Sequence, residues 1–130
     1  MKWLLENVDG LPEKENLVFG TIDTYLIARL SNQESIVTDA TNASRTMLMD
    51  INTLEWSSFM LGEYEMKESW LPRIIKESSG DFGSVSCDEV SSLKGVIISG
   101  VLGDQHASCL GHVLREGQVK NTYGTGCFLL

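Results

Sequence analysis

The sequence is short of two residue types that would indicate particular classes of protein. Its 130 residues contain only three cysteines, Cys87, Cys109 and Cys127, an odd number without paired spacing. A disulfide framework is therefore not expected, and reduced, mostly buried thiols are. Basic residues are also scarce, with 10 Lys and Arg against 18 Asp and Glu and a net charge of −8. A nucleic-acid surface needs clustered positive charge, so nucleic acid is not an expected partner.

Long hydrophobic runs are missing as well. No segment approaches the roughly 20 apolar residues of a membrane-spanning helix, and the N-terminal residues are not followed by a signal-peptide core. The composition is otherwise ordinary for a globular protein, with 42% hydrophobic and 22% charged residues. We expect a soluble protein of the cytoplasm, without an integral membrane segment.

Hydrophobic periodicity and turn residues predict a mixed α/β chain. Helices are expected over residues 3–8, 21–30, 56–64 (interrupted at Gly62) and 105–114, the last closed by Gly117. Strands are expected over residues 46–51, 96–98, 119–123 and 127–130, and loops, turns or weak strands over 7–16, 31–35 and 77–93. The residues predicted to face the core are Ile22, Leu26, Ile27, Leu30, Val96, Ile97, Ile98, Ala107, Leu110, Val113 and Leu114.

The last ten residues, Asn121 to Leu130, contain the most informative local pattern. Gly124, Thr125 and Gly126 form a sharp bend between two β-forming segments, which predicts a hairpin. Glycine lets the main chain approach an anion closely, so the N–H groups and the Thr125 hydroxyl could hold phosphate oxygens. The alternative is a plain hairpin corner, which the same residues would serve equally well.

A carboxylate stands about twenty residues upstream, in Gly103-Asp104-Gln105, where a β-branched run gives way to a helical pattern. The simplest interpretation of Asp104 is a helix cap, because Asp satisfies free N–H groups at a helix start. The alternative is a general base, since a carboxylate and a phosphate-holding turn are the parts that a small-molecule kinase needs.

His106, Cys109 and His112 recur at three-residue steps in the same predicted helix. Such side chains can bind a transition metal, but three-residue steps drift around the helix, and the usual metal-binding pair is spaced by four. No further Cys or His lies near enough in the sequence to complete a site. We therefore predict no metal site formed by these residues.

Four segments together resemble the glycerol kinases, within the FGGY carbohydrate kinases of the actin-like ATPase superfamily. They are residues 19–24, 38–48, 99–105 and 121–130, and the strings Thr-Asn-Ala-Ser-Arg-Thr and Asn-Thr-Tyr-Gly-Thr-Gly-Cys-Phe are specific to the glycerol kinases. The similarity is colinear from Lys2 to Leu130 and covers only a middle part of the family's length. We therefore expect the chain to be a fragment of a longer enzyme.

The resemblance implies a ribonuclease H-like (actin-like ATPase) α/β fold. Residues 1–117 would be the C-terminal part of the first domain, and residues 118–130 the opening hairpin of the second. The implied reaction is transfer of the γ-phosphate of ATP to glycerol with Mg²⁺, giving sn-glycerol 3-phosphate. The alternatives are a related kinase for another polyol or ketose, and a non-catalytic fragment.

The resemblance also implies roles for individual residues. Asp104 falls on the catalytic base and, with Gln105, on the polyol site, whereas Thr125 and Gly126 fall on the nucleotide phosphate turn. Asn42 and Ser44 are expected to fix a loop, and Arg45 to pair with a carboxylate. Glycerol and ATP are the implied partners, and the full-length enzyme could form a homo-oligomer.

The chain departs from the family pattern at several places. The other polyol-binding residues, the first phosphate hairpin and the adenosine pocket have no counterpart in these 130 residues. The segment between Gly111 and Gly117 is one residue shorter than in the family, and residues 66–82 diverge from it. Because parts of the site are absent, we expect the isolated chain to be inactive.

Overall fold

A computed structural model describes residues 1–13 and 16–130. The loop predicted over residues 7–16 therefore includes two, Lys14 and Glu15, that lie outside the described residues. Within the described ranges, each helix is too short or too polar to cross a membrane.

The chain alternates short helices and short strands, as expected for a mixed α/β protein. The α-helices are α1 (Lys2–Asn7), α2 (Ile22–Leu30), α3 (Ala40–Ala43), α4 (Ser58–Glu63) and α5 (Asp104–Gly111). The strands are β1 (Val37–Asp39), β2 (Met49–Asp50), β3 (Glu55–Trp56), β4 (Arg73–Ile75), β5 (Asn121–Tyr123) and β6 (Cys127–Leu129). The described residues also include the 3-10 helices η2 (Ser44–Thr46), η3 (Glu68–Trp70) and η4 (Asp88–Leu93).

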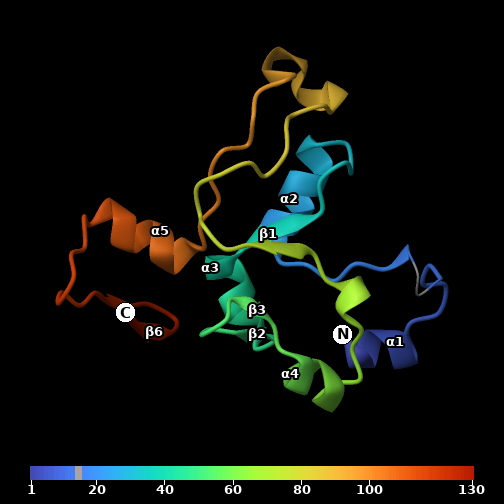
Figure 1. The fold of residues 1–130 in the computed structure, drawn as a ribbon, viewed down its shortest axis with the longest axis horizontal. Helices are drawn as coiled ribbons and strands as arrows, with labels where there is room; N and C mark the ends of the chain where they lie inside the picture. The colour runs from blue at the N-terminus through green and yellow to red at the C-terminus, as the bar shows by residue number, and fades with distance from the viewer. Residues whose placement is uncertain (14–15) are drawn as a thin grey trace.

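The centre of the molecule is the parallel pair β1–β4, in which Val37 lies opposite Arg73 and Asp39 opposite Ile75. β-Branched residues dominate both strands and favour the extended backbone. Helix α2 packs on this pair through a cluster formed by Ile27, Val37 and Phe82. Figure 1 shows this pair at the centre, with the chain extending from it in three directions.

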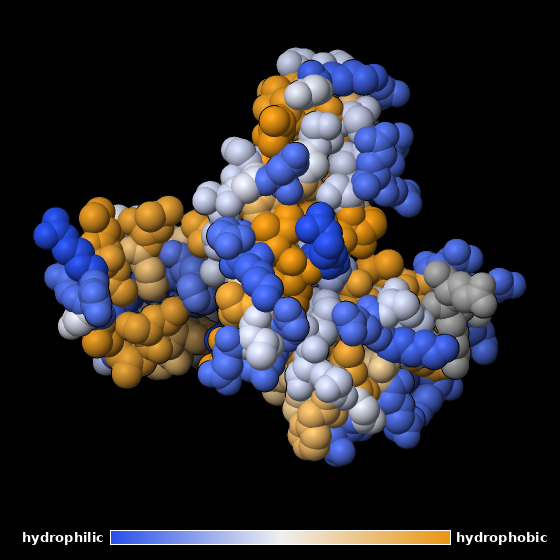
Figure 2. Space-filling model, in the orientation of Figure 1, coloured by the Kyte–Doolittle hydropathy of each residue, from blue (hydrophilic) through white to orange (hydrophobic). Residues whose placement is uncertain are grey.

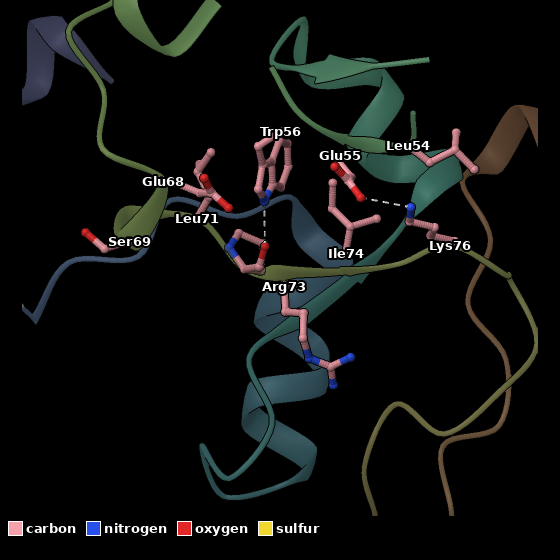
Figure 3. Close-up of a pocket in the computed structure, with 10 residues that line it drawn as sticks. Leu54, Glu55, Trp56, Glu68, Ser69, Leu71, Arg73, Ile74 and Lys76 are labelled. Atoms are coloured by element: carbon pink, nitrogen blue, oxygen red, sulfur yellow. Dashed lines mark hydrogen bonds and ion pairs between the residues drawn. The ribbon is translucent and has the colours of Figure 1, made fainter. Parts of the chain in front are cut away.

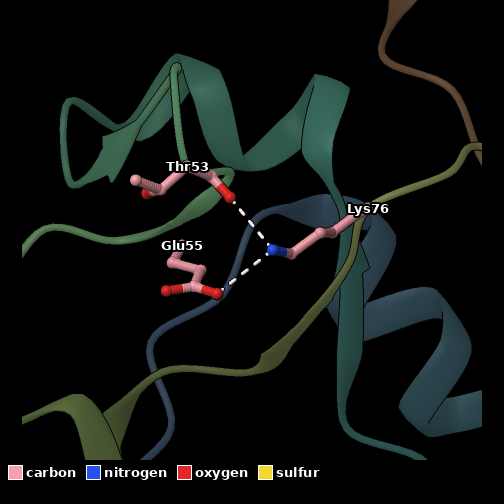
Figure 4. A network of polar contacts seen from close by, with 3 residues as sticks. All are labelled: Thr53, Glu55 and Lys76. Carbon is pink, nitrogen blue, oxygen red and sulfur yellow. Dashed lines mark hydrogen bonds and ion pairs between the residues drawn. The ribbon is translucent and has the colours of Figure 1, made fainter.

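The hairpin β2–β3 lies beside the centre and is tied to β4. Met49 pairs with Trp56 across the hairpin. Lys76, just after β4, donates to the Thr53 carbonyl at 3.0 Å and to Glu55 Oε1 at 3.1 Å (Figure 4). This ion pair is exposed, so its contribution to stability is expected to be small. It nevertheless fixes the hairpin against the end of β4.

The described residues form three small hydrophobic clusters instead of one continuous core. One joins Leu48, Leu61, Met66 and Trp70, and another joins Ala40, Ala43 and Met49. Many large apolar side chains remain at the surface, and Figure 2 shows them on the lobe that holds α5 and the β5–β6 hairpin and again near the centre. The chain therefore presents apolar surface that its own elements leave uncovered.

The predicted helices at 3–8 and 21–30, the turn at 31–35 and the C-terminal hairpin are confirmed. Three local predictions are wrong. The strand over 46–51 is only Met49–Asp50, because η2 precedes it and Met47 adopts a left-handed φ of 63°. Helix α4 continues through Gly62 instead of being interrupted there. The cysteines are all free as expected, but only Cys87 is buried.

The predictions of buried apolar faces are also wrong for α2 and for residues 96–98. Ile22 and Leu26 of α2 are 68% and 51% exposed, so only part of the expected stripe is buried. Residues 96–98 contain one isolated bridge, from Ile97 to Ser84, instead of a buried strand, and Val96 and Ile97 are more than half exposed. The reason is that only the segment 79–85 lies along one edge of this run, with no strand on the other edge among the described residues.

Helix α5 is shorter than predicted. It ends at Gly111, His112 is its C-cap and Val113 follows with a left-handed φ of 53°. Gly111 has low helix propensity and sits where the helix stops. The expected buried side is open, since Leu110 and Val113 are each 69% exposed.

Candidate active site

The carboxyl end of strand β1 holds the most completely bonded side chain of the candidate site. Asp39 is fully buried and caps α3. Its carboxylate accepts hydrogen bonds from the Thr41 and Asn42 N–H groups at 3.2 and 3.0 Å. Side chains add three more, from Thr41 Oγ1 at 2.6 Å, Asn42 Nδ2 at 2.7 Å and Ser78 Oγ at 2.7 Å. These bonds tie β1, α3 and the segment after β4 together.

The hydrogen bonds also decide the charge of this carboxyl group. Burial raises the pKa of Asp39, but the bonds from Thr41, Ser78 and Asn42 together lower it more, so the pKa lies below its usual range. Asp39 is therefore an ionised carboxylate in the interior at neutral pH. Sequence reasoning missed its role, although the Asp-x-Thr-Asn spacing at a helix start is the signal that could have indicated it.

Helix α5 places Asp104 at its first position, with Gly103 as the N-cap. Asp104 is exposed, and its Oδ1 accepts the Gln105 N–H at 2.7 Å. The cap interpretation is therefore partly correct: Asp104 satisfies one free N–H of the helix without being the N-cap residue.

Asp104 lines an open hollow of about 670 Å³ between α2, α3 and the segment before α5. Asn42 and Arg45 line it too, on the polar side, and Ile22, Leu26 and Val101 form an apolar wall. A substrate hydroxyl could reach the Asp104 carboxylate from this hollow. The arrangement is thus compatible with proton acceptance from a small polar molecule.

Gln105 is connected to the C-terminal hairpin by a lysine that sequence reasoning missed. Lys120 is 8% exposed, and its Nζ donates to Gln105 Oε1 at 2.9 Å and to Thr122 Oγ1 at 2.5 Å. With Oε1 occupied as an acceptor, the Gln105 NH₂ group remains as the donor for a ligand. The contact also brings the base of the β5–β6 hairpin against α5.

Thr125 and Gly126 lie at the exposed tip of this hairpin. The Gly124 N–H donates to the Gly126 carbonyl at 3.1 Å and closes the turn. A Cβ on Gly126 would stand 3.0 Å from the Phe128 ring, which gives this glycine a packing reason as well. Within the described chain, no hydrogen bond joins this tip to Asp104, so the structure brings Gln105, but not Asp104, into bonded contact with the hairpin.

Asn42 and Ser44 have the supporting role expected of them, and Arg45 does not. Asn42 bonds Asp39, and Ser44 Oγ donates to the Thr41 carbonyl at 2.9 Å, so both fix their own turn. The expected ion pair of Arg45 is wrong for the described residues: none of their carboxylates lies within ion-pair distance of it. The Arg45 side chain is exposed at the edge of the hollow instead.

A second hollow, of about 620 Å³, lies between β3, η3 and β4 and contains none of the predicted site residues. Trp56 Nε1 donates to the Pro72 carbonyl at 2.8 Å, a bond drawn as a dashed line from the Trp56 ring in Figure 3. Arg73 points away from Trp56 and Glu55, while Lys76 is paired with Glu55. The polar groups do not converge, so this hollow is not the candidate site.

Comparison with known proteins gives the relatives of this chain. The model of the FGGY family of carbohydrate kinases, N-terminal domain, matches residues 1–111. The chain belongs to this family. It is 48% identical to the glycerol kinase of Francisella philomiragia and 46% identical to that of Clostridium perfringens, in each case over its whole length. It spans 26% of the length of each of these relatives.

Solved structures agree with this family membership. The crystal structure of Plasmodium falciparum glycerol kinase with ADP is similar to this chain, with a TM-score of 0.86 and 41% sequence identity. The match covers 98% of this chain and 26% of the Plasmodium chain. The ligand-bound xylulose kinase of Lactobacillus acidophilus has a TM-score of 0.70 and 24% sequence identity, and the match covers 83% of this chain and 22% of the xylulose kinase chain. At this identity the similarity supports the fold alone. The expected actin-like ATPase fold is thereby confirmed.

Asp39→Asn is expected to destabilise the protein in a pH-dependent way. The test uses a chimera in which these 130 residues replace the matching segment of the Francisella philomiragia glycerol kinase. Because an amide has one acceptor oxygen for five donors, the loss at pH 7 should be about 1.5–3 kcal/mol, as for a hydrogen bond to a charged group. The pKa of Asp39 is lower in the folded protein than in the unfolded chain. At a pH above its unfolded-state pKa, Asp39 therefore stabilises the folded protein, and this stabilisation is lost as the pH falls through its folded-state pKa.

Thermal melts of the chimera and its variant measure this effect. The difference between their midpoints should be constant above about pH 5 and shrink below about pH 4, around the usual pKa of Asp. Asp9→Asn, at an exposed turn, is the matched control and should leave the midpoint nearly unchanged. A midpoint difference that does not change with pH would contradict the assignment of Asp39 as an ionised buried carboxylate.

Proposed function

We propose that this chain is part of an ATP-dependent glycerol kinase that makes sn-glycerol 3-phosphate. In this proposal residues 1–117 are the C-terminal part of the first domain and residues 118–130 open the second. The observation that carries the proposal is the placement of Asp104 at the start of α5, on an open hollow, in a chain 48% identical to a glycerol kinase.

In the proposed reaction Asp104 accepts the proton of a glycerol hydroxyl as that oxygen attacks the γ-phosphorus of ATP. A hydroxyl is a poor nucleophile until its proton is accepted, and a positioned base contributes about 10²–10⁴-fold to the rate. Gln105 donates a hydrogen bond from its NH₂ group to a second hydroxyl, with Lys120 holding the amide in that orientation. Thr125 and the N–H groups at the hairpin tip hold the transferred phosphate.

The described residues contain no group of three or more His, Cys, Asp or Glu side chains that could hold a metal ion by themselves. Mg²⁺ is often bound through one or two carboxylates together with substrate phosphates. We propose that it enters as the ATP complex, where it neutralises charge on the phosphates. We propose that the reaction takes place in the cytoplasm, where ATP is available.

The second candidate is a kinase for another polyol or a ketose. It is less favoured because the chain is 46–48% identical to glycerol kinases but only 24% identical to a xylulose kinase of the same fold. A non-catalytic role is the third alternative, and it is separated from the others by an assay for phosphoryl transfer.

The chimera defined above tests the proposed function. Glycerol-dependent ADP release, measured by a coupled assay, is expected within about tenfold of the unsubstituted host, since volume-conserving differences are usually tolerated. The host lacking the segment is the negative control. A folded chimera with no glycerol-dependent ADP release would overturn the proposal and favour a non-catalytic role.

Thr125→Val in the chimera is expected to raise the KM for ATP far more than the KM for glycerol. Valine keeps the shape of threonine but removes the hydroxyl, so a phosphate contact is lost while a hairpin corner is kept. Steady-state kinetics with each substrate varied in turn measure the two constants. Thr53→Val, at an exposed turn outside the hollow, is the matched control. Equal changes in both constants with intact turnover would indicate a plain hairpin corner.

A further inference from the structure

The start of helix α5 is bonded to the buried Asp39 through a single side chain. Thr41 Oγ1 lies 2.6 Å from Asp39 Oδ2 and 2.7 Å from the Gly103 nitrogen. An ionised carboxylate only accepts, so the one Thr41 hydroxyl proton points to Asp39. The Thr41 lone pairs are then free to accept the Gly103 N–H. The direction of both hydrogen bonds is fixed by the charge on Asp39.

Thr41 has little freedom to move away from Gly103. Asp39 is held in turn by Asn42 and by Ser78, so the acceptor of the Thr41 proton is fixed. Gly103 is buried, and a Cβ on it would meet the Thr41 carbonyl oxygen and Oγ1 at 3.4 Å each. The Gly103 carbonyl accepts the Ala107 N–H at 2.8 Å, the first hydrogen bond of α5. The contact therefore sets where the helix begins.

We propose that Thr41, held by Asp39, is a positioning residue for Asp104. This inference rests on the proposed function, because it concerns the carboxylate assigned there as the base. Asp104 follows Gly103 directly, is exposed, and bonds only within its own helix among the described residues. Its carboxylate is therefore placed by the Gly103 peptide. Loss of the Thr41 bond lets that peptide shift and misplaces the base relative to the glycerol hydroxyl.

The expected effect is on turnover. A displacement of about 1 Å can cost on the order of 10²-fold in rate, so Thr41→Val in the chimera should lower kcat by about 10- to 100-fold. The KM values for glycerol and ATP should stay within about threefold of those of the parent chimera. Thr41 does not line the hollow and is proposed to bind neither substrate. Thr41→Ser keeps the hydroxyl and should restore kcat to near the parent value.

Thr46→Val is the matched control. Like Thr41 Oγ1, Thr46 Oγ1 donates one hydrogen bond and accepts one backbone N–H: it donates to the Ala43 carbonyl at 2.6 Å and accepts the Leu48 N–H at 3.1 Å. Among the described residues it has no bond to α5. A purely structural role predicts equal effects of the two substitutions. A positioning role predicts that Thr41→Val lowers kcat and Thr46→Val does not. Thr41→Ala carries the same prediction should Thr41→Val fail to fold.

Two further measurements decide the proposal. In the Asp104→Asn background, Thr41→Val should lower kcat no further, since there is no base left to position. Hydrogen–deuterium exchange over residues 101–107 should speed up in Thr41→Val and not in Thr46→Val. The exchange readout does not need an active chimera, so it separates this inference from the proposed function. Unchanged exchange, full turnover in Thr41→Val, or an equal loss in the Asp104→Asn background would each overturn the proposal.

Discussion

Replacing Asp104 with Asn in the chimera is expected to remove most turnover while leaving glycerol binding measurable. Asparagine has nearly the same size and can still accept the Gln105 N–H, so the start of α5 should be retained. It cannot accept the hydroxyl proton, which matters in the transition state more than in the bound state. The expected loss in kcat is therefore about 10²–10⁴-fold, with a much smaller change in the KM for glycerol.

Steady-state kinetics on the purified variant measure both constants. Asp88→Asn is the matched control, because Asp88 is likewise an exposed Asp in the first turn of a helix, η4, and lies outside the hollow. It should leave kcat unchanged. Retention of more than about a tenth of the parent turnover in Asp104→Asn is too much for loss of a general base and would contradict that role.

The isolated 130 residues are expected to phosphorylate no glycerol and to be only marginally folded. Each sheet has two strands, and such pairs are marginal in water without further strands or cover. The three hydrophobic clusters are small, while Ile22, Leu26 and Leu110 are more than half exposed. Uncovered apolar surface of this kind favours aggregation or docking onto another chain. Phosphoryl transfer needs the nucleotide and the acceptor to be held in position against each other, and the chain spans 26% of the length of the glycerol kinases it matches.

A thermal melt and an ADP-release assay on the isolated chain test the two halves of this prediction. The chimera serves as the positive control in both, since it supplies cover for the exposed helices and strands. Under the prediction the isolated chain gives a broad transition and no glycerol-dependent ADP. A sharp cooperative melt together with glycerol-dependent ADP release would show that the chain is a complete catalytic unit.

The short-range features of the fold could be predicted from the sequence. Thr21 before an apolar stripe predicted α2, and Gly124-Thr125-Gly126 between β-forming residues predicted the β5–β6 hairpin, both as observed. The placement of Asp104 at the beginning of a helix was predictable for the same reason. Capping preferences, turn chemistry and periodicity act over a few residues, so they can be recognised without knowing what packs around them.

Burial and long-range bonding were decided by the tertiary structure. The same periodicity predicted buried faces for α2 and α5, yet Ile22 and Leu110 are exposed, because burial depends on which other segment covers a face. The bonds from Asp39 to Ser78 and from Thr41 to Gly103 join residues 39 and 62 positions apart. No local pattern encodes such a pairing, since it arises only when β1, α3 and α5 meet. The sequence by itself thus determined the candidate base and the candidate phosphate turn, and the tertiary structure decided the hydrogen bonds that join the start of α5 to Thr41 and Asp39.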